Sequence, residues 1–196
     1  MRALRLVLAI ALALCAAACL PVTTATPVGS TVGFANDPGI EGTWSGRIDK
    51  DSPATTYFHF LANQDNTFTL VGVTSKSGDD KGGWGTYSVT TAVLGGHRYI
   101  NARETSDDGK AATPDAQKTN IPLLYTVSGD TLTLYLLDED LSAAAIAAHK
   151  IDGKVTKSEY TTDVAITSDS AHLDALLASD AGVKLFKVFM VLTRLK

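Results

Sequence analysis

The stretch YTVSGDTLTLYLLD, residues 125–138, constrains the fold of this chain more than any other segment. Apolar and polar residues alternate on both sides of Gly129 and Asp130, which suit a two-residue hairpin turn. The residues that this turn brings face to face are Ser128 with Thr131, Val127 with Leu132, and Tyr125 with Leu134. Since polar residues then meet polar ones and apolar residues meet apolar ones, the sequence predicts an antiparallel hairpin in this register.

Short strand patterns recur along the chain from Ile40 onward. The segment TTYFHFLANQDNTFTLVGV, residues 55–73, alternates apolar with polar residues on both sides of the turn-forming NQDN. Further strands are predicted at residues 85–91, 97–103, 154–158, 162–167 and 187–194. Because many short strands at this spacing suit antiparallel sheets, the sequence predicts a mainly β domain built as an antiparallel barrel or sandwich.

The last predicted strand is apolar on both of its faces. One face carries Phe186, Val188, Met190 and Leu192, and the other carries Phe189 and Val191. Both faces need a cover to keep them from water, so we expect a helix to pack on this strand.

Two segments in the C-terminal third have helical signals. DEDLSAAAIAAHK, residues 138–150, begins with acidic residues and ends with a His-Lys pair, which complements the helix dipole. SDSAHLDALLAS, residues 168–179, begins with Ser and Asp as N-cap candidates and places four apolar residues near one face. We expect two short α-helices that cover or plug the sheet.

The N-terminus has the layout of a secretory signal. Arg2 and Arg5 form a basic head, and the apolar run from Leu6 to Ala18 is shorter than the about 20 residues of a membrane span. Three alanines directly precede Cys19, and this resembles the lipobox of bacterial lipoproteins. The resemblance implies cleavage before Cys19 and attachment of a diacylglycerol group and an N-acyl chain such as palmitate to it. Two hydrophobic groups of this kind hold a protein stably at a membrane.

The residues also allow an ordinary signal that is cleaved after Ala18 or near Ala25, with Cys19 as an incidental apolar residue. The number of cysteines favours lipidation, because Cys15 leaves with the signal and Cys19 then has no partner for an intramolecular disulfide. Leu20, rather than an aspartate, follows the cysteine, which resembles the outer-membrane address of Gram-negative lipoproteins. We therefore expect a lipid anchor in the cell envelope, in the outer membrane of a Gram-negative bacterium.

Cleavage before Cys19 divides the chain into three predicted parts. Residues 1–18 are the signal peptide, residues 19–39 are the lipidated cysteine with a flexible tether, and residues 40–196 form a single β domain. The tether is predicted from a composition rich in Thr, Pro and Gly without periodicity, and about 20 flexible residues reach roughly 25 Å.

The mature chain is acidic. Loss of Arg2 and Arg5 lowers the basic count from 17 to 15 against 21 acidic residues, so the formal net charge changes from −4 to −6. Binding to phosphate backbones needs a basic face, which the sequence does not offer, and nucleic acid is therefore excluded as a partner.

The start of the β domain resembles that of lipocalins, because GTW at residues 42–44 opens its first strand. The resemblance implies a lipocalin-like β-barrel in which Trp44 closes one end and Arg194, from the last strand, lies over the indole. A cation above an aromatic ring contributes about 0.5 to 2 kcal/mol. The order of EGTW, GGHRYINAR, SGDTLTLYLLDEDL and TTDVAITSDSAHLDALLA is also similar to a group of bacterial lipoprotein-like proteins of unknown function, which implies a fold but no reaction.

Residue patterns that carry chemistry are scarce. GTWSG does not have the spacing of a nucleophile elbow, and its Ser45 is expected within a strand. The histidines, which stand far apart without a second metal ligand at suitable spacing, are His59, His97, His149 and His172. The acidic groups GDDKGG, SDDGK and DEDL do not follow the calcium-loop pattern and are interpreted as two turns and a helix start. We therefore expect no enzyme activity, no cofactor and no bound metal.

Two functions fit these observations. The first is an interaction or scaffolding protein whose barrel is filled by side chains and which binds an envelope protein through an exposed apolar patch. The second is a carrier for a small apolar ligand or a lipid, which needs a cavity of roughly 300 Å³ or more. Barrels of about eight strands are either filled or hold one small ligand, and we rank the filled barrel first. Trp84, in GGWG, is expected at a barrel mouth or in the core.

Overall fold

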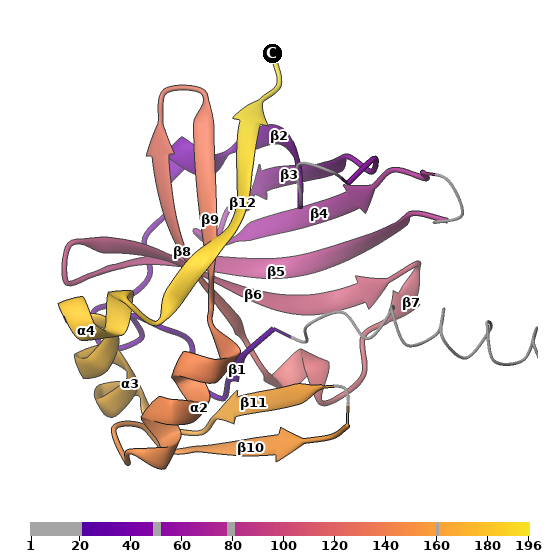
Figure 1. Cartoon of the computed structure of the whole chain (residues 1–196). Helices are drawn as coiled ribbons and strands as arrows, with labels where there is room; N and C mark the ends of the chain where they lie inside the picture. Colours follow the sequence, from indigo (N-terminus) through magenta and orange to yellow (C-terminus); the bar gives the residue numbers. More distant parts are fainter. Residues whose placement is uncertain (1–20, 49–51, 78–80, 160) are drawn as a thin grey trace, which may run out of the picture.

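The computed structural model describes residues 21–48, 52–77, 81–159 and 161–196, and it contains a closed barrel of eight antiparallel strands (Figure 1). The strands of the barrel are β2 (Gly42–Arg47), β3 (Thr56–Ala62), β4 (Phe68–Thr74), β5 (Gly83–Leu94), β6 (His97–Asp107), β8 (Ile121–Ser128), β9 (Thr131–Leu137) and β12 (Phe186–Arg194). They follow one another in the order β5-β4-β3-β2-β12-β9-β8-β6, and pairing of β5 with β6 closes the ring. The prediction of a mainly β, lipocalin-like barrel is confirmed.

The β8–β9 hairpin forms in the predicted register. The observed cross-strand pairs include Ser128 with Thr131, Val127 with Leu132, and Tyr125 with Leu134. Gly129 has a φ of 57° in the turn, a left-handed conformation that glycine adopts without strain. Cross-strand matching of polar and apolar residues was therefore sufficient to predict this register.

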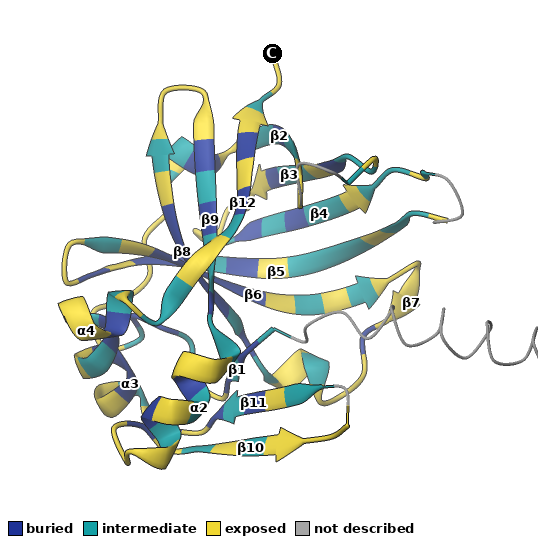
Figure 2. Cartoon of the chain, viewed as in Figure 1, coloured by how far each residue is buried: buried dark blue, intermediate teal, exposed yellow. Residues whose placement is uncertain are grey.

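Large apolar side chains point into the barrel and form its core. Successive residues of a strand point to opposite faces, and Figure 2 shows buried and exposed positions alternating along the barrel strands. The largest fully buried side chains of the barrel core are Ile40, Trp44, Phe60, Phe68, Ile100, Tyr125, Leu132 and Met190. Phe60 and Phe68 meet edge to face with 6.5 Å between their ring centroids.

A second layer is inserted between β9 and β12 and covers part of the barrel from outside. It consists of α2 (Glu139–Ala147), β10 (Gly153–Lys157), β11 (Thr162–Ile166), α3 (Ser170–Leu177) and α4 (Asp180–Val183). Its apolar residues form a second core with Tyr99, Leu124 and Leu137, from the outer faces of β6, β8 and β9. The two predicted helices are confirmed as α2 and α3, whereas α4 was not predicted. The two predicted strands β10 and β11 pair with each other in a separate small sheet.

The prediction of a flexible tether at residues 19–39 is wrong for its described part, which starts at residue 21. Val22 and Val28 are only 2% and 0% exposed, and β1 (Thr23–Thr24) pairs parallel with β11. The side chain of Asn101 accepts a hydrogen bond from the Val28 amide at 2.7 Å, and that of Asp174 accepts one from the next amide, also at 2.7 Å. Buried side chains elsewhere in the chain thus order a segment whose own composition favours disorder. The folded domain includes residues from 21 onward, not from 40.

The prediction that a helix covers β12 holds only for its first residue, Phe186, which packs on the second core together with Leu173 and Leu177 of α3. A β-bulge between Val188 and Met190 inserts Phe189 as an extra residue into the strand. Phe189 and Met190 consequently both pack on the barrel core, while Val188 and Val191 are 58% and 53% exposed. The bulge turns Phe189, Met190 and Leu192 toward the barrel core, so the apolar residues left on the outer face beyond Phe186 are the smaller Val188 and Val191.

Three short elements complete the described part of the chain: η1 (Pro38–Ile40), β7 (Lys110–Ala111) and η2 (Ala116–Lys118). None of the described helices is long and apolar enough to cross a membrane.

Candidate functional site

One end of the barrel is closed by η1 together with the two residues predicted to close it, Trp44 and Arg194. Trp44 is fully buried, and its indole Nε1 donates a hydrogen bond to the Ile40 carbonyl oxygen at 2.8 Å. The guanidinium carbon of Arg194 lies 4.0 Å from the centroid of the Trp44 ring. Arg194 also donates hydrogen bonds to two backbone carbonyl oxygens, in and directly after η1. The structure therefore forms the predicted arginine–tryptophan contact at this end of the barrel, which we call the closed end.

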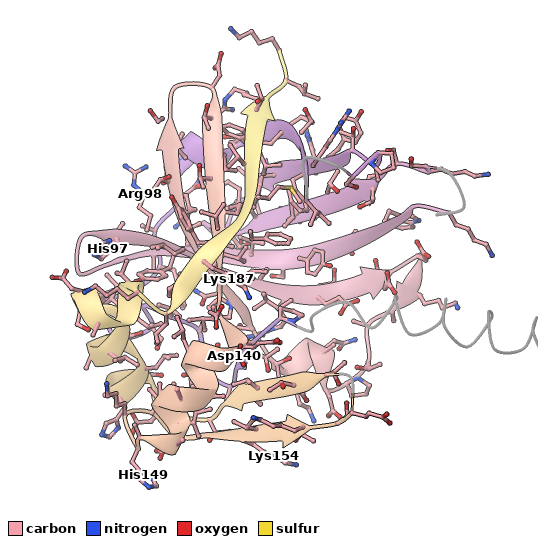
Figure 3. All side chains as sticks on the ribbon, viewed as in Figure 1. His97, Arg98, Asp140, His149, Lys154 and Lys187 are labelled. Atoms are coloured by element: carbon pink, nitrogen blue, oxygen red, sulfur yellow. The ribbon has the colours of Figure 1, made fainter. Side chains whose placement is uncertain are left out.

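Asp37, directly before η1, is a further residue of the closed end that the sequence did not reveal. Its carboxylate accepts a hydrogen bond from the Tyr125 hydroxyl at 2.6 Å and pairs with Arg98 at 3.3 Å. Burial, followed by the hydrogen bond to Asp37, raises the pKa of Tyr125, so the phenol stays protonated as a donor. Figure 3 shows Arg98 beside His97 at one side of the barrel. This cluster ties the segment before η1 to the barrel wall.

An open groove of about 440 Å³ lies outside the barrel next to this cluster. It forms where β8 separates from β6, whose last cross-strand pair is Arg98 with Tyr125. Leu124 and Tyr135 supply apolar lining to the groove. Arg98, the charged group at its edge, is already engaged by Asp37, which weakens the groove as a site for an anion.

The opposite end of the barrel holds an apolar pocket of about 280 Å³. Phe58, Tyr87, Phe189 and Met190 contribute to its lining. Gly72 provides part of the space, since a Cβ atom at this position would come within 3.1 Å of the Phe58 ring. Phe58, Tyr87 and Phe189 are partly buried against the barrel core, so the pocket lies directly beside that core.

Acidic side chains stand near the open end. Glu104 pairs across the strands with Tyr87, and Asp107 lies further along the same strand. Burial, followed by the charges of Glu104 and Asp107, raises the pKa of Tyr87. A cleft of about 220 Å³ beside Glu104 and Ile121 is also lined by Pro21, the first described residue. The N-terminal end of the described chain therefore lies near the open end of the barrel.

The outer face of β2, β3 and β4 is free of the inserted layer, which lies on the other side of the barrel (Figure 1). Tyr57 and Leu61 project from this face of β3 and are 39% and 44% exposed. Val191, on β12 at the other side of β2, is 53% exposed. We call Tyr57, Leu61 and Val191, which stand apart on this face with polar residues such as Ser45 and His59 between them, the lateral patch.

No protein family, curated protein or solved structure matches this chain. The barrel therefore identifies an architecture, and one architecture serves many functions. The function has to be argued from the two ends and the outer faces of the barrel.

The histidines and acidic motifs noted in the sequence lie at separate places. His59 contacts the Thr43 hydroxyl within the sheet, and His172 pairs with Asp169 at the start of α3. SDDGK forms the β6–β7 turn, and DEDL starts α2 with Asp138 as its N-cap. Within the described ranges, no three His, Cys, Asp or Glu side chains gather as a metal site. GDDKGG lies partly outside the described residues, and Cys19 lies wholly outside them.

Proposed function

We propose that this protein is a lipid-anchored envelope protein with a lipocalin-like barrel, and that it binds an envelope protein partner rather than catalysing a reaction. The anchor is Cys19, and the location is the outer membrane of a Gram-negative bacterium. The observation that carries the binding role is the core of large buried side chains inside the barrel. Because residues such as Trp44, Phe60 and Met190 occupy its interior, the outer surface is where a partner binds.

The lateral patch supports this role. Interfaces between proteins combine an apolar centre that is rich in aromatic residues with a polar rim. Tyr57 and Leu61 offer such a centre on β3, and His59 lies between them on the same face of the strand. The inserted layer and the N-terminal segment already cover the opposite half of the barrel, so a partner is expected on the lateral patch.

The positions of the ionisable side chains favour a binding role over catalysis. Asp37, Asp138, Asp169 and Asp174 each accept hydrogen bonds that hold a helix start or a loop in place. Catalytic groups need a shared cleft in which a reacting atom meets a base and a stabilising donor. These carboxylates instead serve separate structural contacts.

A carrier is the second candidate, and the pocket at the open end favours it. Its volume of about 280 Å³ is close to the lower limit for small-molecule sites, and its lining is aromatic. Such a pocket suits one short apolar group, for example the end of an acyl chain.

The test is the mass of the protein purified from bacterial membranes in detergent, compared with that of Cys19→Ser. We expect the denatured wild-type protein to carry the added mass of diacylglycerol and acyl groups, and the variant to lack it and to leave the membrane fraction. An unmodified wild-type chain would reject the anchor. A native mass that exceeds the denatured mass by one small apolar molecule would favour the carrier over the protein-binding role.

A further inference from the structure

The ordered chain begins close to the proposed anchor. Val22 is buried and Thr24 bridges to Asn120, so the segment is fixed to the domain from its first described residues. Cys19 precedes Pro21 by two positions, and two extended residues span at most about 7 Å. A membrane that holds acyl chains on Cys19 is therefore within about 10 Å of Pro21. This step rests on the proposed lipidation of Cys19.

Pro21 lies at the open end of the barrel. It lines a cleft together with Glu104 and Ile121. Ile121 packs on the barrel core, and Glu104 is two residues beyond Ala102, which also belongs to that core, so both side chains are on the inner face near the end of their strands. The short connection to Cys19 thus leaves the open end, not the closed end, near the membrane.

Exposed apolar side chains are present on the rim of the same end. Ile48, directly after β2, is 58% exposed, Val73 near the end of β4 is 41% exposed, and Trp84 at the start of β5 is 45% exposed. Val73 and Trp84 pair across the strands. We call these three residues the rim. Tryptophan is a preferred residue at membrane interfaces, because its ring is apolar and its N–H group can bond to water or headgroups.

The rim is near the N-terminal attachment point along β6. Trp84 and Asp108 are linked by two hydrogen bonds, one from the Trp84 amide to the Asp108 carboxylate and one from the Asp108 amide to the Trp84 carbonyl oxygen. Asp107 is three positions, about 10 Å of strand, beyond Glu104, which lines the cleft beside Pro21.

The charges around the rim suit a zwitterionic lipid surface. Lys76 and Lys81 are exposed on either side of the connection between β4 and β5, and Asp107 and Asp108 are exposed at the end of β6 and directly after it. Headgroups such as phosphatidylcholine carry both a phosphate and an ammonium group, which can meet charges of both signs at short range.

We propose that the rim of the open end contacts the phospholipid surface in which Cys19 is anchored. The barrel then stands on the membrane with its closed end pointing away. In this orientation Leu61, further from the membrane along β3, faces sideways, toward other proteins of the same membrane. Tyr57 adjoins the rim, because it pairs across the strands with Val73, and the pocket faces the lipid.

The test uses the lipidated mature protein, which begins at Cys19, in phosphatidylcholine vesicles with brominated acyl chains, which quench nearby tryptophan fluorescence. The sequence has two tryptophans, Trp44 and Trp84, and Trp44 is fully buried at the closed end. The difference between the wild-type protein and Trp84→Phe therefore reports on the rim. We expect Trp84 emission to lose most of its intensity when the acyl chains are brominated. We also expect it to lie at shorter wavelength in vesicles than in their absence.

A matched control places the probe at the other end of the same strand. Val93 is 56% exposed near the closed end of β5, so V93W in the Trp84→Phe background has similar access to water and is expected to escape quenching. I48W in that background is a second rim probe and is expected to be quenched. A cooperative thermal unfolding transition is used to check that each variant is folded.

Two results would overturn the orientation, and neither affects the anchor. One is tryptophan fluorescence at positions 48 and 84 that is not quenched, in a protein that floats with the vesicles. The other is equal quenching at positions 48, 84 and 93. A wild-type protein that does not float, and behaves as Cys19→Ser does, would instead reject the lipid anchor, and the orientation with it.

Discussion

The guanidinium of Arg194 illustrates how one residue at the closed end makes several contacts at once. Its planar face lies over Trp44, while its nitrogens donate hydrogen bonds to two backbone carbonyl oxygens around η1. A lysine carries the same charge but has neither the flat face nor the forked set of donors. The closure of this end therefore depends on the shape of the arginine as well as on its charge.

We predict that Arg194→Lys lowers the free energy of unfolding by about 1–2 kcal/mol, because the ring contact and one hydrogen bond are lost. Urea unfolding followed by circular dichroism measures the loss. Lys196→Ala is the control, since the Lys196–Asp130 ion pair is 83% and 52% exposed and is worth about 0.5 kcal/mol or less. Equal losses in the two variants would contradict the proposed closing role.

The sequence revealed only part of the residue-scale detail. Trp44 and Arg194 were found through a resemblance to lipocalins, which carries the pairing of two positions 150 residues apart. Asn101 and Asp174 were not found. Their partners on the N-terminal segment are 73 and 145 residues away, and a hydrogen bond over such a separation leaves no local pattern.

Strands and helices were predicted well where one periodicity runs without interruption, and poorly where a single residue breaks it. The predicted strand at 85–91 is the centre of β5 (Gly83–Leu94), and the β8–β9 register is as predicted. In β12, strict alternation assigned Phe189 to the face opposite Met190. The bulge at Phe189 shifts the alternation by one residue and brings both side chains to the core. Sequence alternation alone does not show such a shift.

The bulge leads to a prediction for β12. Phe189→Asp is expected to lower the free energy of unfolding by about 2–4 kcal/mol, because a charge replaces an aromatic ring against the barrel core. Val188→Asp, at the preceding residue, is the matched control and is expected to change it by about 0.5 kcal/mol or less, because Val188 is 58% exposed. Thermal and urea unfolding of both variants measure the difference. A larger loss for Val188→Asp would show that the bulge is misplaced.

At the level of the whole molecule, the N-terminal segment joins the barrel to the inserted layer. β1 pairs with β11 of the inserted layer, and Val28 is held by Asn101 of β6. Asp174 of α3 accepts hydrogen bonds from the amide of Gly29 and from the amide and hydroxyl of Thr31. The segment therefore belongs to the domain, although its composition resembles that of a linker. The composition of a segment indicates how much apolar surface its own residues can bury. This segment is ordered instead by side chains that other parts of the chain provide.

This arrangement predicts that a chain starting at Asn36 is much less stable than one starting at Leu20. Removal of the segment takes away the buried side chains of Val22 and Val28, each of which contributes about 1.5–3 kcal/mol to the free energy of unfolding. It also leaves buried polar groups of Asn101 and Asp174 without partners, which costs about 1–3 kcal/mol for each residue. Since 1 kcal/mol shifts the Tm of a protein of this size by about 2–4 °C, we expect a fall of at least about 10 °C. Differential scanning calorimetry of the two purified chains measures this difference in Tm.

The control is Val32→Ala with Phe34→Ala in the longer chain, because these side chains are 58% and 42% exposed and their loss is expected to leave the Tm nearly unchanged. Two chains with the same Tm would mean that the segment is a tether after all, and the distance limit that orients the barrel on the membrane would then no longer apply.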